Sequence, residues 1–179
     1  MARKLIISAG HGGTDSGAVG NGYIERDLTI ELRDLIVSEL SSLGVKAETD
    51  PNQNALKETL AWLRGKFGSR DILFDIHWNA GPAAAKGSEV IVPEVSSDYE
   101  KKLAEALLKV LTDIGFKSRG VKPESETARK TLGWMRPVAE NVLIEICFIS
   151  NATDMKLYQA NKQTIAKRIA NVLKTFSNI

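Results

Sequence analysis

The chain has 179 residues, of which 43% are hydrophobic and 26% are charged, a composition typical of one globular domain with a full hydrophobic core. Lysine and arginine number 24 against 22 aspartates and glutamates, and a net charge of +2 gives no reason to expect a nucleic-acid partner. One cysteine, Cys147, excludes an internal disulfide framework. No stretch approaches the ~20 apolar residues that a membrane span needs. We expect one monomeric domain over residues 1–179.

Short apolar runs and leucine-rich helical spacing alternate along the chain. In chain order, the predicted elements are a strand at 4–8, a helix over 25–43, a strand at 45–49, a helix over 56–67, strands at 71–78 and 88–92, a helix over 103–114, a strand at 141–148 and a C-terminal helix around 165–176. Strands that alternate with helices predict an α/β domain with a largely parallel sheet.

The sequence contains only two histidines, and each follows a short apolar run. His11 stands in AGHGGTDSGA after the first predicted strand, and His77 ends the third in ILFDIHWNAG. Glu25 lies three and seven residues before Leu28 and Leu32, on the core-facing stripe of its helix. Because ligands of open α/β sheets collect at the carboxyl ends of strands, both histidines should lie at one edge. Two imidazoles and a carboxylate are the ligand set of a catalytic zinc ion with an open position for water.

Glu145 lies inside the apolar run NVLIEICFIS, where an unpaired carboxylate is unfavourable unless it has a function. Period-two alternation places it on one strand face with Leu143 and Cys147. Apolar neighbours should raise its pKa, which suits a general base and acid near neutral pH. With zinc-bound water as the nucleophile, Glu145 would carry the proton during amide hydrolysis. The sequence lacks HExxH, which argues against the helix-borne metalloprotease arrangement.

Each feature also has a structural interpretation. A lone histidine is more often structural than a ligand, and GHGG could be a tight turn. Glu25 could be a first-turn acid favoured by the helix dipole, and Glu145 could pair with an arginine in the core. Cys147 is expected to be a buried small hydrophobe and not a nucleophile. The occurrence of all these features together favours a metal site, because otherwise both histidines would lack a function by coincidence.

The sequence resembles the zinc-dependent N-acetylmuramoyl-L-alanine amidases of the AmiC/CwlV type, amidase family 3, over essentially its whole length. Four blocks in order carry the resemblance: GHGGTDSGAVGNGYIERDL, DIHWNAG, RGVK followed by LGWMRP, and VLIEICFISNATD. The resemblance implies a six-stranded sheet flanked by helices. It also implies cleavage of the amide between N-acetylmuramic acid and L-alanine in peptidoglycan, with one zinc held by His11, Glu25 and His77 and with Glu145 as the catalytic residue.

Substrate contacts are expected from Asn79 and from the positive charges of Arg119 and Arg136, because a stem peptide carries carboxylates. Lys122 is a further candidate, although a solvated surface charge is the favoured interpretation for it. Trp78 is expected to stack on a sugar or line the groove. The family usually has a small residue at its position, and usually glycine in place of Cys147.

Trp134 could contact a sugar in the same way, whereas Trp62 is expected to pack on a helix.

The sequence leaves three other functions open. The chain could be a zinc carboxypeptidase acting within the stem peptide, a non-enzymatic peptidoglycan-binding module, or an α/β protein with a structural metal.

Peptidoglycan lies outside the cytoplasm, so the expected place of action is the cell wall, in the periplasm or outside the cell. The apolar run in the N-terminal segment MARKLIIS is too short for a signal peptide, and no wall-binding repeat is visible. A phage endolysin that stays in the cytoplasm until its release, or a trimmed autolysin, would explain both observations.

Overall fold

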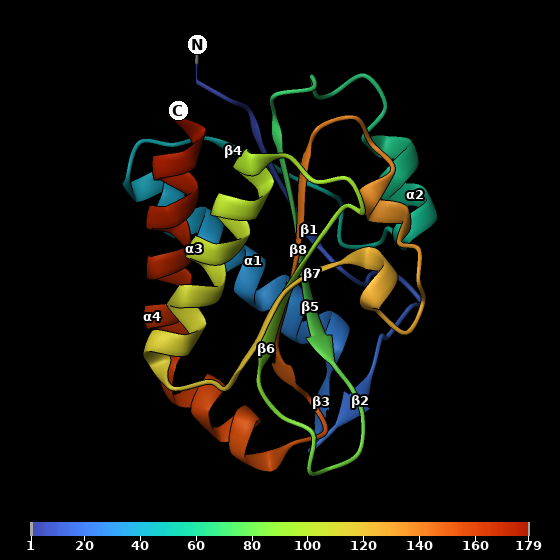
Figure 1. Ribbon diagram of the computed structural model, residues 1–179, viewed down its shortest axis with the longest axis vertical. Helices are drawn as coiled ribbons and strands as arrows, with labels where there is room; N and C mark the ends of the chain where they lie inside the picture. Colours follow the sequence, from blue (N-terminus) through green and yellow to red (C-terminus); the bar gives the residue numbers. More distant parts are fainter. Residues whose placement is uncertain (1, 179) are drawn as a thin grey trace.

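A computed structural model describes residues 2–178 as a six-stranded sheet packed between helices (Figure 1). The strands of this sheet are β1 (Leu5–Ala9), β4 (Ala47–Thr49), β5 (Ile72–Asn79), β6 (Ser88–Val92), β7 (Ser118–Pro123) and β8 (Glu140–Phe148). The helices are α1 (Glu25–Ser42), α2 (Leu56–Trp62), α3 (Asp98–Ile114) and α4 (Ala152–Ser177), with short 3-10 turns η1 (Glu124–Glu126) and η2 (Gly133–Met135). Strands β2 (Val19–Gly20) and β3 (Tyr23–Ile24) form a separate hairpin.

The strand order is β4-β1-β5-β8-β6-β7. All neighbours run parallel except β6 and β8, which are antiparallel. This confirms the predicted α/β class and the mostly parallel, mixed six-stranded sheet. Because β1, β5 and β8 are parallel neighbours, their carboxyl ends lie at one edge, where His11 follows β1 and His77 lies near the end of β5.

The two faces of the sheet carry hydrophobic cores of different size. Helices α1, α3 and α4 pack on one face, with α3 and α4 on the left of Figure 1, and bury the larger core with residues such as Leu32, Leu107 and Ile169. The other face is covered by α2 and η2 over a smaller cluster that includes Leu63 and Trp134.

Local sequence signals explain where the long helices begin and end. Ser97 and Glu100 form a reciprocal capping box at the start of α3, and Gly115 ends this helix in the left-handed conformation with φ of 117°. The Asn151 side chain accepts hydrogen bonds from two backbone N–H groups at the start of α4. No helix within residues 2–178 is both long enough and apolar enough to cross a membrane.

Several local predictions were wrong or incomplete. Helix α4 begins at Ala152 and helix α3 at Asp98, both earlier than predicted. Helix α2 ends at Trp62 and does not continue to residue 67, because turns follow and Gly65 has φ of 74°. The β2–β3 hairpin was missed, although Asn21-Gly22 with φ of 50° and 82° is a strong sequence signal for a tight hairpin turn. Strand β7 was also missed, since its residues are only half-buried or exposed and lack alternation.

A register shift in β8 changes the face of the sheet on which Cys147 lies. The pairing of β5 with β8 moves from His77 opposite Glu145 to Asn79 opposite Phe148, so β8 gains one residue at this point. As a result, Cys147 joins Ile146 in the larger core instead of sharing the face of Glu145. The prediction that Cys147 is a buried small hydrophobe is confirmed, but the alternation that placed it beside Glu145 was wrong.

Candidate active site

The three predicted ligand residues converge. Glu25 Oε1 lies 3.2 Å from His11 Nε2 and 3.1 Å from His77 Nδ1. One ligand atom from each of the three residues lies within 4.8 Å of the others, a grouping that could hold a metal ion. The two imidazole rings meet edge to face, with centroids 4.9 Å apart. A loop after β1, the first residue of α1 and strand β5 therefore supply one side chain each.

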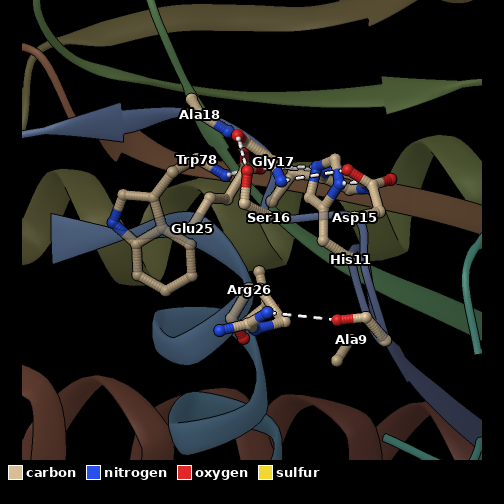
Figure 2. A network of polar contacts seen from close by, with 12 residues as sticks. Ala9, His11, Asp15, Ser16, Gly17, Ala18, Glu25, Arg26 and Trp78 are labelled. Carbon is tan, nitrogen blue, oxygen red and sulfur yellow. Dashed lines mark hydrogen bonds and ion pairs between the residues drawn. The ribbon is translucent and has the colours of Figure 1, made fainter. Parts of the chain in front are cut away.

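Glu25 points inward from the start of α1, as the helical spacing predicted, and is 3% exposed. Its second oxygen, Oε2, accepts the backbone N–H of Ala18 at 2.8 Å, and Oε1 also accepts the backbone N–H of Trp78 at 2.9 Å. Figure 2 shows Glu25 between these two backbone groups. Burial alone would raise the pKa of Glu25, but contacts with His11 and His77 outweigh it and hold the pKa well below its usual range.

Both histidines have a carboxylate on their other ring nitrogen. Asp75 Oδ2 lies 3.1 Å from His77 Nε2, and Asp15 Oδ2 lies 3.0 Å from His11 Nδ1. Burial lowers the pKa of His77, but the facing Asp75 and Glu25 raise it well above its usual value. A carboxylate on the second nitrogen is the usual partner of a metal-binding histidine, because it sets the ring orientation.

Asp75 is not among the predicted site residues, although it is 2% exposed in the middle of an apolar strand. The signal was available: a residue two positions before His77 in a strand lies on the same face, and a buried aspartate needs a partner.

Two glycines are required by the close packing of this site. A Cβ atom on Gly10 would lie 2.3 Å from the His77 ring. A Cβ atom on Gly17 would lie 2.6 Å from Glu25 Oε2, and Gly17 also has φ of 61°. The glycines of the first block therefore admit the ligand side chains, in addition to forming turns.

Glu145 lies next to the ligands on the neighbouring strand. It stands opposite His77 of β5 and opposite Glu89 of β6. Its Oε2 is buried and has no hydrogen-bond partner within the described residues. Burial raises the pKa of Glu145 to about 8. The arginine partner of the structural interpretation is therefore not observed, and the predicted rise of the pKa agrees with the structure.

The expected substrate-binding residues are found in different surroundings. Trp78 is 2% exposed and packs edge to face against Tyr158, and Trp134 is 1% exposed in the smaller core. This burial argues against the expected sugar contacts of both tryptophans. The burial of these two tryptophans could not be predicted from their positions in a strand and a short turn, because it results from tertiary packing.

The polar candidates lie outside the core. Asn79 donates to Glu89 at 2.7 Å, and Arg119 donates to the same carboxylate at 2.9 Å. Arg136 forms an ion pair with Glu124, on the connection between β7 and β8. Asn79 and Arg119 therefore belong to one cluster next to Glu145, whereas Arg136 belongs to another.

Comparison with protein families gives one match over nearly the whole chain. Residues 5–175 match the family model described as N-acetylmuramoyl-L-alanine amidase, amidase family 3.

The chain is also similar to individual proteins. The chain is 33% identical to the uncharacterized protein YqiI of Bacillus subtilis over 85% of this chain and 73% of that protein. It is 29% identical to the N-acetylmuramoyl-L-alanine amidase LytC of Bacillus subtilis, over 89% of this chain but only 32% of LytC. Among solved structures, the catalytic domain of the CD27L endolysin targeting Clostridia Difficile has a TM-score of 0.77 at 25% identity and covers 99% of both chains.

Proposed function

This chain belongs to the N-acetylmuramoyl-L-alanine amidase family, amidase family 3, and from that premise we propose that it hydrolyses peptidoglycan by a zinc-dependent mechanism in which Glu145 carries the proton. Enzymes of this family cleave the amide between N-acetylmuramic acid and L-alanine. The observation that supports the proposal most is the convergence of His11, Glu25 and His77 beside Glu145, whose buried Oε2 has no hydrogen-bond partner among residues 2–178.

The donor set suits zinc. Two imidazoles and a carboxylate are the ligands of many hydrolytic zinc sites, and zinc accepts both nitrogen and oxygen donors. Glu25 is buried and ionised, and nothing but the two histidines and two backbone N–H groups balances its charge among the described residues. His11, Glu25 and His77 would hold the ion. When bound, zinc would polarise the scissile carbonyl and lower the pKa of a water molecule.

Glu145 would transfer a proton during the reaction. Without a metal, burial raises the pKa of this carboxyl group to about 8. A bound cation would bring the pKa back toward neutral, where the group can both accept and donate a proton. We propose that it takes a proton from the attacking water and passes this proton to the leaving nitrogen of L-alanine. Its unpaired, buried Oε2 supports this role, because a structural carboxylate would be expected to have a partner.

The substrate places the action at the cell wall. The chain spans about three quarters of YqiI and one third of LytC, so the role of the whole protein, as an autolysin or an endolysin, is part of the proposal. Asn79 and Arg119 are the candidates for stem-peptide contacts, because both lie in the polar cluster next to Glu145.

Mass spectrometry of muropeptides digested with zinc-loaded protein tests the function. The expected product is a peptide with a free N-terminal L-alanine, together with a glycan that has lost its stem. Release of a C-terminal amino acid instead would identify a carboxypeptidase. His77→Ala should lose bound zinc as well as activity, and full retention of zinc would contradict the ligand assignment.

A further inference from the structure

A second polar cluster lies on the sheet face of the active site. Glu89 of β6 stands opposite Glu145, and β7 follows as the next strand. Glu89 Oε2 accepts hydrogen bonds from Arg119 Nε at 2.9 Å and Lys122 Nζ at 2.6 Å. Its Oε1 accepts from the Asn79 side chain at 2.7 Å. Directly opposite residues of paired strands point to the same side, so this cluster continues the row of active-site side chains across the sheet.

The cluster has one more positive charge than negative charges. Glu89 is 8% exposed, and although burial would raise its pKa, hydrogen bonds from Lys122, Asn79 and Arg119 lower it, so the carboxylate is ionised. Lys122 alone is sufficient to neutralise it. The charge of Arg119 is therefore in excess, and a protein site with excess positive charge favours an anionic ligand.

Two contacts orient the Arg119 side chain, but they leave part of its hydrogen-bonding capacity unfilled. Its guanidinium lies 4.9 Å from the centroid of the Phe148 ring, which orients it, and only Nε contacts Glu89. Its two terminal nitrogens have no hydrogen-bond partner within residues 2–178, and the side chain is 33% exposed. A guanidinium with two free terminal nitrogens can bind a carboxylate through two parallel hydrogen bonds.

We propose that Arg119 binds the free carboxylate of the second residue of the stem peptide, an inference that rests on the proposed function. Neighbouring strands lie about 4.8 Å apart, so a guanidinium bound to Glu89 stands roughly 8 Å from Glu145 when one hydrogen bond is added. An extended peptide advances about 3.3–3.6 Å per residue, so two residues span roughly 7 Å and a hydrogen bond to the guanidinium covers the remainder. Arg136 is assigned no such role, because Glu124 already pairs with it.

Two synthetic muramyl peptides test the proposal. They are identical except that the second stem residue has either a free carboxylate or its amide. Zinc-loaded wild-type protein should hydrolyse the free acid with a kcat/KM at least roughly tenfold higher, as expected for a charge-assisted hydrogen bond. In Arg119→Gln this ratio should fall toward one, mainly through a higher KM for the free acid.

Two further variants control the experiment. Arg119→Lys keeps the charge without the two terminal nitrogens, so its ratio should be intermediate. Arg168→Gln removes an exposed charge from α4, on the opposite face of the sheet, and should keep the wild-type ratio. Circular dichroism establishes that each variant is folded, and Arg119→Lys serves as the test if Arg119→Gln is not.

The outcomes separate the two proposals. Equal hydrolysis of both peptides by the wild type, or an unchanged preference in Arg119→Gln, would overturn the carboxylate site and leave the amidase function intact. Failure to cleave either peptide, together with no product from whole peptidoglycan, would overturn both.

Discussion

Glu145 shows most clearly how one residue changes its character with its surroundings. The same side chain in water would ionise near pH 4.5, but here burial raises its pKa to about 8. Glu25, which is also largely covered, has its pKa shifted in the opposite direction because two histidines face it. The two carboxylates are therefore suited to different proposed tasks: an ionised Glu25 to binding a cation, and Glu145 to exchanging a proton.

Replacement of Glu145 by glutamine separates proton transfer from metal binding. Glu145→Gln keeps the shape and removes the titrating group, so turnover should fall by ~100- to 10,000-fold while zinc stoichiometry stays at one per chain. Turnover on purified peptidoglycan and zinc analysis are the measurements. Loss of zinc would show that Glu145 is a ligand, and near-normal turnover with zinc retained would show that another residue carries the proton.

The pH dependence of stability gives an independent test of the Glu145 environment. Since the folded-state pKa of about 8 exceeds the ordinary value of 4.5, the folded protein binds this proton more tightly than the unfolded chain. The stability that this provides is complete below about pH 4.5 and is lost as the pH rises through about 8. Glu145→Gln has no such loss, so it should become more stable than the wild type at pH 8.5.

Denaturant unfolding of metal-free wild type and Glu145→Gln at pH 5 and pH 8.5 measures this effect. Metal-free protein is required, because a cation beside Glu145 would lower its pKa. The difference in the free energy of unfolding between the two proteins should grow by on the order of a few kcal/mol from pH 5 to pH 8.5. A difference that is the same at both pH values would show that Glu145 is solvated.

At the scale of elements, the site depends on the loop between β1 and the hairpin. This loop carries His11 and passes so close to β5 that Gly10 contacts the His77 ring. It is held at its other side by the segment after β4, where Gly13 N–H donates to the Asn52 carbonyl at 2.9 Å. The position of the first histidine is therefore determined by two segments that are distant in sequence.

Gly10→Ala should disturb the site without unfolding the protein. The added methyl group would stand 2.3 Å from the His77 ring, so the imidazole must move away from Glu25 and His11. Zinc affinity should fall roughly tenfold or more, as for other disturbances of ligand orientation. Competition with a chromogenic chelator measures it. Gly68→Ala, whose Cβ would lie 3.7 Å from its nearest neighbour, is the matched control and should bind zinc normally.

At the scale of the whole molecule, the larger hydrophobic core lies mostly away from the proposed metal-binding residues. The larger cluster fills the face covered by α1, α3 and α4, whereas the ligands lie at the carboxyl edge of the sheet. The segment before β1 is also joined to the last helix, since Arg3 N–H donates to the Ser177 carbonyl at 2.8 Å. A domain of 179 residues can bury enough surface to fold without a metal.

Removal of zinc should therefore abolish activity and preserve the fold. After treatment with a chelator, the far-UV circular dichroism spectrum should remain close to that of the zinc-loaded protein, and added zinc should restore turnover. Global unfolding on chelation would show that the metal is structural. Full activity in the chelator would contradict zinc dependence.

The sequence by itself determined the α/β class, the long helices, most strands and the residues that converge at the site. These features depend on local patterns: helical spacing behind Glu25, apolar runs before His11 and around His77, and a carboxylate isolated in β8. Only the tertiary structure decided which side chains are covered, because Trp78 and Trp134 are buried by elements far away in the chain. It also decided the face of Cys147, since the extra residue in β8 arises from pairing with β5 and not from the sequence of β8 alone.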